Sequence, residues 1–395
     1  MNIYNILLII VIIIILVFMI SPSINLLITD NFSNGSGYGF NNNKNKLSTI
    51  TAISPIAKAT DFKLLSLMSK VKYLFVKSAS KNCNKNIILF PGNTDYILQQ
   101  NGYEVWPSNI NKIDNQSAAN VFNNNNGHFN AITTLLKNIG YTENDRMNTI
   151  NYDFRSFDIE IIINKFINYL KNDTVIIAYD FGAVIANICI NRLCEIDKNK
   201  IDKFLLICPT IGGVPMTLRD YFTSSVINSN IIEKYYSILM SMPHELMYSK
   251  PVAIYDSLSY YPNVNNLCKL LEYENKPIQL FKQLRLLQEE SLINPNVNCV
   301  IIANNEFATP MCYDFSNNLK QAPVRYSGVN NNKFLENNKT YEGIQTQGDK
   351  VVPFNTILKL AEMWNKNCKL EIIRNKDHNT ILKSYELALI IMANL

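Results

Sequence analysis

Residues that bind metals or nucleic acids are scarce in this sequence. There are only three histidines, and the eight cysteines lack the paired short spacings that are typical of zinc sites. Charged residues make up 17% of the chain, and its formal net charge of +5 rests on scattered lysines without a basic run. We therefore predict no metal, no other cofactor and no nucleic-acid partner.

The chain does contain ample apolar and aromatic material for a core. Hydrophobic residues make up 47% of its 395 residues and aromatic residues 11%, which excludes general disorder. A chain of this length suits one large domain or two of ordinary size.

An apolar run near the N-terminus predicts membrane targeting. Residues 6–20 contain no polar side chain, and as a helix they would span about 22 Å, against roughly 30 Å for the bilayer core. No Lys or Arg precedes the run, whereas Ser21 and Ser23 supply small residues for cleavage. We predict that residues 1–23 are an N-terminal signal anchor or signal peptide, and that residues 24–50 are a flexible linker.

The rest of the chain would then enter the secretory lumen, as a membrane-anchored or secreted protein. Five Asn-Xaa-Ser/Thr sites are compatible with glycosylation in that compartment. They begin at Asn31, Asn34, Asn115, Asn172 and Asn338.

Short β-branched runs alternate with helical patterns over most of the remaining chain. Continuous apolar strands separated by helices are typical of a parallel sheet that is buried on both faces. We predict an α/β core formed by residues 51–208 and 296–395. The alternation fails at 209–295, which we predict to be an inserted helical cap. Strands are expected at 86–90, 149–153, 174–179, 203–208, 298–303 and 370–374, and helices at 128–139, 160–170, 182–194, 231–242, 278–287, 356–364 and 380–394.

The segment Ala178-Tyr179-Asp180-Phe181-Gly182 joins an apolar strand to a helix through small residues. This is the context of a nucleophile elbow, where the residues two before and two after the nucleophile must be small. Ala178 and Gly182 meet that requirement, but the residue at the tip is Asp180 rather than serine. The elbow favours the α/β-hydrolase fold within the α/β class.

That fold requires an acid and then a histidine after later strands. His378 lies between the last expected strand and the last helix, where the fold places its base. Asp349, in a loop before the helix at 356–364, is the candidate acid. The other two histidines, His128 and His244, lie in a polar loop and in the cap, where we expect surface histidines. We therefore predict an Asp180-His378-Asp349 triad.

An ordered set of short motifs between about residues 85 and 395 resembles the family of lecithin:cholesterol acyltransferase and lysosomal phospholipase A2, which includes the phospholipid:diacylglycerol acyltransferases. The motifs are Phe90-Pro91-Gly92-Asn93, Trp106-Pro107, Tyr152-Asp153-Phe154-Arg155, Gly212-Gly213 with Leu218-Arg219, Phe307-Ala308-Thr309-Pro310 with Tyr313, Gly348-Asp349 with Val352-Pro353, and His378-Asn379 with Leu382. Each motif is weak alone, whereas their common order is fairly specific.

The resemblance implies roles for further residues. It assigns the acid to Asp349, the base to His378, and an oxyanion hole to the backbone N–H groups of Asn93 and Phe181. It also places Cys299 where family members carry a cysteine. In an oxidising lumen, Cys299 and Cys368 would form a disulfide or remain a pair of buried thiols.

The aspartate at the elbow leaves three hypotheses open. The resemblance implies a lipid acyl hydrolase or O-acyltransferase acting on a lipid or membrane-derived substrate, but the family's serine is absent. The elbow alone is similar to that of the Asp-nucleophile branch of the fold, which includes epoxide hydrolases. The third hypothesis is a catalytically inactive, lipid-binding member of the acyltransferase family.

Overall fold

The computed structural model describes residues 85–395, except 101–102, 107–119, 124–126, 156, 224–235, 256–257, 273–277 and 315–341. The segment at 1–23, the linker at 24–50 and the glycosylation sites other than Asn172 lie outside the described residues. Asn172 lies in an exposed turn. In the described part of the chain, no helix is long and apolar enough to cross a membrane.

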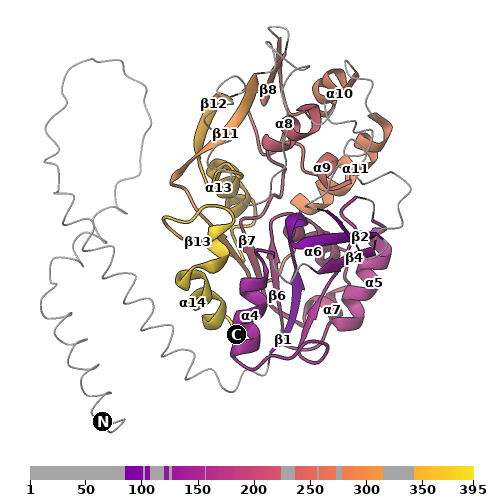
Figure 1. Cartoon of the computed structure of the whole chain (residues 1–395), viewed down its shortest axis with the longest axis vertical. Coiled ribbons are helices and arrows are strands. Elements are labelled where there is room, and N and C mark those ends of the chain that lie inside the picture. The colour runs from indigo at the N-terminus through magenta and orange to yellow at the C-terminus, as the bar shows by residue number, and fades with distance from the viewer. Residues whose placement is uncertain are drawn as a thin grey trace, which may run out of the picture. The chain divides into compact units, whose positions relative to one another are not determined.

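Six strands form the central sheet, in the order β13-β10-β7-β6-β1-β5 (Figure 1). Every neighbouring pair is parallel. All residues of β1 and β6 are buried, as expected for strands that are covered on both faces. The bounds are Asn86–Phe90 for β1, Met147–Thr149 for β5, Thr174–Tyr179 for β6, Ile201–Ile207 for β7, Cys299–Ala303 for β10 and Cys368–Ile372 for β13.

Helices pack on both faces of this sheet (Figure 1). Ile87 and Val175 face one core, which also includes side chains of α4 (Asn130–Asn138), η6 (Thr380–Lys383) and α14 (Tyr385–Ala393). Ile88 and Ile176 face the other core, which includes side chains of α5 (Ile159–Tyr169), α6 (Phe181–Asn191) and α13 (Phe354–Met363). Because successive side chains of a strand point to opposite faces, one continuous apolar run supplies both cores. The predicted parallel α/β core is confirmed.

Several boundaries differ from the sequence-based prediction; the helix expected at 278–287, for example, extends to Leu292. The strand expected at 149–153 is found at Met147–Thr149, so only Thr149 is shared, and Tyr152 and Phe154 beyond it are buried in the core. The helix expected at 380–394 is divided into η6 and α14 at Ser384. The hydroxyl of Ser384 accepts the N–H of Leu387 at 3.1 Å and so caps α14.

Two smaller sheets were not predicted. One has the order β3-β2-β4 and the other the order β12-β11-β8-β9. Because β8 lies in the insertion and pairs with β11 of the following segment, the insertion is not purely helical and its sheet extends past residue 295. The bounds are Tyr96–Gln100 for β2, Tyr103–Trp106 for β3, Asn120–Asn123 for β4, Ala253–Tyr255 for β8, Leu258–Tyr260 for β9, Phe307–Asp314 for β11 and Glu342–Gly348 for β12.

The last helix of the insertion packs on the core. The insertion contains α8 (Met216–Thr223), α9 (Tyr236–Met240), α10 (Val264–Glu272) and α11 (Ile278–Leu292), and the short helix α7 (Glu195–Lys198) precedes it in the core. The Asn187 amide of α6 donates to the carbonyls of Ser291 and Ile293 at 2.7 and 2.9 Å. The Trp364 indole donates to the carbonyl of Leu292 at 3.0 Å. The predicted insertion, 209–295, therefore ends in a helix that packs on the core.

A buried arginine of α11, Arg285, binds two loops of the insertion. Arg285 is 2% exposed, and its guanidinium donates to the carbonyls of Pro243 and Pro262 at 2.9 and 2.6 Å. Arg285 also donates to the side-chain oxygen of Gln288 at 2.8 Å. These bonds connect α11 to two loops of the insertion, so the insertion is held to the helix that packs on the core.

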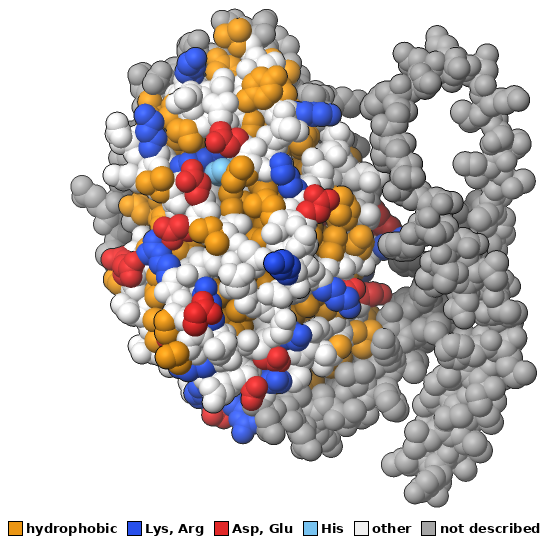
Figure 2. Space-filling model, turned by 180° about the vertical axis from the view of Figure 1, so that it is seen from behind, with side chains coloured by type: hydrophobic (Ala, Val, Ile, Leu, Met, Phe, Trp, Pro, Cys, Tyr) orange, Lys and Arg blue, Asp and Glu red, His pale blue; other side chains and the backbone are white. Residues whose placement is uncertain are grey.

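Charged side chains of both signs are scattered over the face shown in Figure 2. Lys and Arg side chains alternate there with Asp and Glu side chains and with apolar ones, and neither sign gathers into a stripe. This distribution agrees with the absence of basic runs in the sequence.

Candidate active site

Asp180 occupies the tip of a strained turn between β6 and α6. Its backbone has φ 53° and ψ −126°, a conformation that residues other than glycine rarely adopt. The N–H of Asp180 donates to the carbonyl of Ile207 at 3.1 Å, which holds the turn against the end of β7. Such strain persists where the surrounding structure enforces it, and it is characteristic of a nucleophile elbow.

Gly182 and Gly92 allow two backbone segments to meet at this turn. A Cβ on Gly182 would lie 2.2 Å from the carbonyl oxygen of Phe90, so only glycine fits. A Cβ on Gly92 would lie 3.0 Å from Oδ2 of Asp180. The loop after β1 therefore lies directly against the Asp180 side chain.

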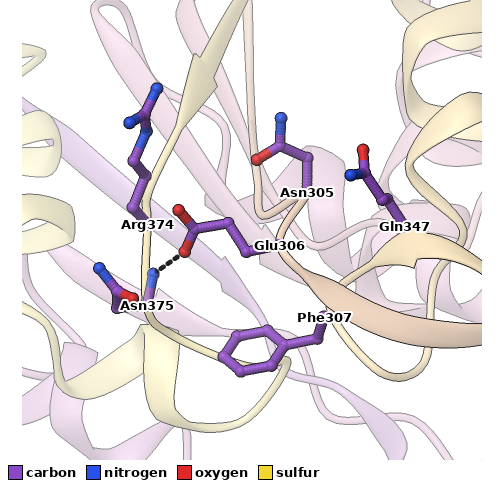
Figure 3. A pocket seen from close by; sticks show the side chains of 6 residues that line it. All are labelled: Asn305, Glu306, Phe307, Gln347, Arg374 and Asn375. Atoms are coloured by element: carbon purple, nitrogen blue, oxygen red, sulfur yellow. Dashed lines mark hydrogen bonds between the residues drawn. The ribbon is translucent and has the colours of Figure 1, made fainter. Parts of the chain in front are cut away.

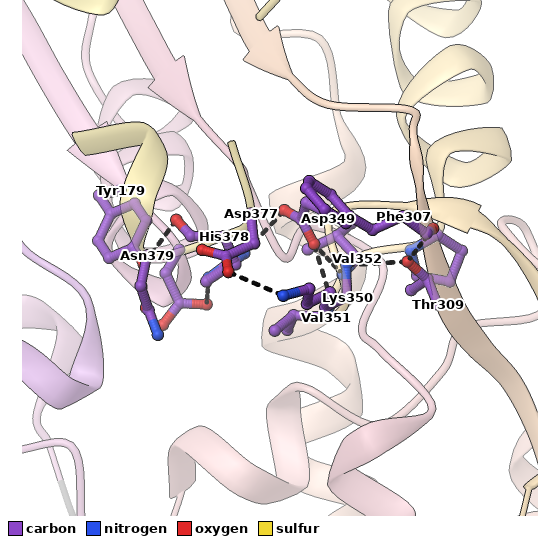
Figure 4. A network of polar contacts seen from close by, with 12 residues as sticks. Tyr179, Phe307, Thr309, Asp349, Lys350, Val351, Val352, Asp377, His378 and Asn379 are labelled. Atoms are coloured by element: carbon purple, nitrogen blue, oxygen red, sulfur yellow. Dashed lines mark hydrogen bonds and ion pairs between the residues drawn. The ribbon is translucent and has the colours of Figure 1, made fainter. Parts of the chain in front are cut away.

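His378 and Asp349 form the predicted pair (Figure 4). Nδ1 of His378 lies 2.8 Å from Oδ2 of Asp349, and the N–H of His378 donates to the Asp349 carbonyl at 2.9 Å. The other carboxylate oxygen of Asp349 accepts the N–H groups of Val351 and Val352 at 2.9 and 2.6 Å. Both oxygens of this buried carboxylate are thus hydrogen-bonded, as a buried charge requires.

The same imidazole faces Asp180. Nε2 of His378 lies 3.6 Å from Oδ1 of Asp180, which is ion-pair distance and slightly longer than a hydrogen bond. The His378 side chain is 8% exposed and that of Asp180 17% exposed. The structure therefore brings the three residues of the predicted triad together, with His378 between Asp180 and Asp349.

The charge state of His378 follows from its neighbours. Burial opposes a positive charge on this imidazole, but the carboxylates of Asp349 and Asp180 outweigh burial and raise the pKa of His378 well above its ordinary value of 6.5. The pair of Asp180 and His378 is accordingly an ion pair at neutral pH, with the proton on the imidazole.

The two N–H groups assigned to an oxyanion hole both begin a helical turn next to Asp180. Phe181 is the first residue of α6, and Asn93 is the first residue of η1 (Asn93–Asp95). N–H groups at such positions have no acceptor within their own helix. The Tyr152 hydroxyl donates to the carbonyl of Pro91 at 2.8 Å and so supports the loop that carries Asn93.

Two buried residues near the triad were missed in the sequence. Cys208 directly follows β7, and its sulfur lies within 4.8 Å of the ligand atoms of Asp349 and His378. Burial, together with the charge of Asp349, raises the pKa of Cys208 to about 12, so it is a neutral thiol. Asp95 lies in η1, three residues after Gly92. The only sequence signal for Asp95 was an acidic residue close to the Pro-Gly loop.

Cys208, Asp349 and His378 are also the group among the described residues that could hold a metal ion. Nδ1 of His378 and Oδ2 of Asp349 already bind each other. A metal there would therefore have to replace the hydrogen bond on which the predicted triad depends.

His244 differs from its predicted surface position. It is 2% exposed, and its Nδ1 accepts the N–H of Leu246 at 3.1 Å. Burial and the nearby charge of Arg285 lower the pKa of His244 to about 3, so it is uncharged. His128 is half-buried. Among the described residues, no hydrogen bond or ion pair joins either histidine to Asp180 or Asp349.

The two cysteines of the implied disulfide are register partners on β10 and β13. In the structure Cys299 and Cys368 are both free thiols. Their arrangement matches the alternative of a thiol pair, on neighbouring strands that place the two residues side by side.

A hollow of about 510 Å³ lies beside the loop that carries His378 (Figure 3). Its lining is polar and does not include the triad. The N–H of Asn375 donates to the carboxylate of Glu306, and both residues line the hollow. The lining residues are Asn305, Glu306, Phe307, Gln347, Arg374 and Asn375.

The strand order, the helices on both faces and the strained elbow define an α/β-hydrolase fold. No protein-family model matches the chain, and no curated protein matches it.

Similar solved structures include a carboxylesterase of the thaumarchaeon Nitrososphaera gargenis (10% identity, TM-score 0.35, 78% of this chain and 89% of that chain). MenH from S. aureus is 13% identical, with a TM-score of 0.35 over 80% of this chain and 94% of that chain. A bromoperoxidase from Bacillus anthracis is 11% identical, with a TM-score of 0.35 over 79% of this chain and 93% of that chain.

Proposed function

We propose that the protein is a hydrolase that uses Asp180 as its nucleophile and forms an alkyl-ester intermediate. The observation that carries this proposal is the ion pair between the carboxylate at the elbow and an imidazole whose other nitrogen is fixed by Asp349. A scaffold without chemistry would require neither the strained backbone at Asp180 nor a glycine pressed against Phe90.

The chemistry of a carboxylate favours attack on a saturated carbon. Attack on an ester carbonyl would give an anhydride and would have to expel an alkoxide that is far more basic than the carboxylate. Attack on the carbon of an epoxide gives an ordinary ester, and ring strain assists the breaking of the C–O bond. We therefore propose an epoxide or a related alkyl electrophile, carried on an apolar substrate.

In the first step, an oxygen of Asp180 forms a bond to the carbon while the C–O bond of the epoxide breaks. The bonding pair stays on the epoxide oxygen, which takes up the proton of the His378 imidazolium. Because the pKa of His378 is raised, its imidazole carries that proton at neutral pH. The products are a hydroxyalkyl ester of Asp180 and a neutral imidazole.

In the second step, neutral His378 removes a proton from water, and the hydroxide attacks the carbonyl carbon of the ester. The N–H groups of Asn93 and Phe181 would stabilise the oxyanion that forms. The substrate oxygen then leaves as the alcohol of a diol, and Asp180 returns to a carboxylate beside an imidazolium. Esterification removes the Asp180 charge that helps to hold the proton on His378, so the first step prepares the base for the second.

The test is a single turnover in ¹⁸O-labelled water with enzyme in excess over styrene oxide. We expect the heavy isotope in the peptide that contains Asp180 and the original Asp180 oxygen in the diol. A peptide that contains Asp153 serves as the internal control, and Asp180→Ala should form no diol. If diol forms with all of the heavy oxygen and none enters Asp180, water attacks the substrate directly and the proposal is wrong.

A second candidate is the lipid acyl hydrolase or acyltransferase implied by the motif resemblance. Its support is that several motif residues meet at the site: Tyr152 bonds to Pro91, and the Thr309 hydroxyl accepts the N–H of Lys350, next to Asp349. A lipid substrate and attachment to the membrane through residues 1–23 would belong to this function. Hydrolysis of phospholipid or acyl-ester vesicles by the unmodified chain would favour it, whereas lipid binding without turnover would favour the inactive member.

A further inference from the structure

Asp95 is a buried carboxyl group behind the loop that approaches Asp180. It ends the turn that Asn93 begins, and its N–H donates to the carbonyl of Gly92 at 3.1 Å. Its Oδ1 accepts the N–H of Phe129, just before α4, at 2.8 Å. One carboxyl group therefore connects the loop to α4.

The second oxygen of this carboxyl group has no partner. Oδ2 of Asp95 is buried and forms no hydrogen bond with the described residues, and the whole residue is 0% exposed. A buried carboxylate with one bare oxygen is costly, whereas a neutral acid is much less so. Because Asp95 is inaccessible, it cannot touch a substrate, and any effect on the reaction must act through its neighbours.

The groups whose charges act on Asp95 belong to the site. The Asp180 carboxylate disfavours a second negative charge at Asp95, and the His378 imidazolium favours it. The Tyr179 hydroxyl, whose own ionisation Asp95 opposes, is buried and neutral. Burial is the largest effect and raises the pKa of Asp95 to about 7. Backbone hydrogen bonds with Phe129 and Gly92 lower this pKa, but by less than burial raises it.

We propose that Asp95 is a positioning residue of the active site that permits turnover only while its carboxyl group is uncharged. This inference rests on the proposed function and adds a control to it. An uncharged Asp95 fixes the turn that carries the N–H of Asn93 without placing a negative charge behind it.

Ionisation of Asp95 would impair the second step in two ways. A negative charge two residues from Asn93 opposes an oxyanion at that N–H group. The same charge holds the proton on His378, because the attraction between the two groups is mutual, and a protonated imidazole cannot activate water. The rate should therefore fall as the pH rises through the pKa of Asp95.

Asp95→Asn is the decisive variant, because it keeps the size of the side chain and an acceptor for the N–H of Phe129 but cannot ionise. The first measurement is an NMR titration of the imidazole of His378 from pH 5 to 10, with the signal identified by its loss in His378→Asn. We expect the midpoint of His378 to be about one pH unit lower in Asp95→Asn than in the wild type. Asp145→Asn removes a charge at an exposed position and should leave the midpoint unchanged.

The second measurement is the pH dependence of styrene oxide turnover. Above pH 7, the wild-type rate should fall about tenfold for each pH unit, whereas the rate of Asp95→Asn should stay level until its His378 loses the proton that the first step requires. Superimposable profiles, or a folded Asp95→Asn protein that is inactive at every pH, would overturn the proposal. If the wild type itself has no turnover, the hydrolase function has failed on this substrate, and an unshifted His378 midpoint would separately overturn the role of Asp95.

Discussion

Nε2 of His378 faces Oδ1 of Asp180 at 3.6 Å, so the base and the residue at the elbow form an ion pair rather than a base and a proton donor. With serine at the elbow, the imidazole would have to remove a proton from the nucleophile. A carboxylate has no such proton to give. In the proposed reaction, His378 would instead protonate the leaving oxygen and later activate water.

Asp180→Ser tests whether acyl-transfer machinery remains around the elbow. The change removes one of the charges that raise the pKa of His378, so the imidazole can act as a neutral base toward the serine hydroxyl. We expect hydrolysis of p-nitrophenyl butyrate to exceed that of Asp180→Ala by roughly 10² or more. Equal rates in the two variants would mean that Asn93 and Phe181 do not form an oxyanion hole.

His378→Asn should separate the two proposed steps. The variant retains Asp180 but lacks both the imidazolium that protonates the epoxide oxygen and the base that activates water, so the ester on Asp180 should form slowly, with water as the proton donor, and then accumulate. Intact-protein mass spectrometry would detect one bound substrate, and peptide mapping would locate it. The wild type should show no lasting adduct. A variant that turned over normally would exclude His378 as the base.

His378 should also affect stability in a pH-dependent way. Its pKa is raised in the folded protein, so its ion pairs contribute stability that is fully present below the unfolded pKa of about 6.5 and is lost as the pH rises through the folded value. The difference in unfolding free energy between the wild type and His378→Asn should therefore be larger at pH 6 than at pH 10. Urea unfolding at both values measures it, and a difference that grew with pH would contradict the assignment.

The predictable parts of this protein are those specified by local pattern. The apolar run at Thr174–Tyr179 and the small residues after it specified both a strand and the elbow, and chain order then selected Asp349 and His378. The antiparallel pairing of β11 and β12 was missed because Glu342–Gly348 has no regular apolar alternation. Asp95 was missed because its burial depends on α4, which follows much later in the chain.

Gly182→Ala should disrupt the site through the backbone. Its Cβ would lie 2.2 Å from the carbonyl of Phe90 and 2.5 Å from that of Pro91, so the loop that carries Asn93 must shift. We expect a loss of about 1–3 kcal/mol in the free energy of unfolding and a loss of styrene oxide turnover. Gly140→Ala is the matched control, because its Cβ has no neighbour within 4 Å and only its φ of +110° is strained. That control should lose stability but keep normal reactivity at Asp180.

The thiols of Cys299 and Cys368 should react slowly in the folded protein. Their strands pair in register, which places the two Cα atoms about 4.8 Å apart, within the range of a disulfide. Burial raises the pKa of Cys299 strongly and that of Cys368 to about 11, so few thiolates are present at neutral pH.

Cys194 is exposed and serves as the internal control. In protein made under reducing conditions, iodoacetamide at pH 7 should modify Cys194 first and reach the pair only after unfolding. Equal rates at the three cysteines would show that β10 and β13 open readily, and a pair that is unreactive even after unfolding, until a reductant is added, would establish the disulfide.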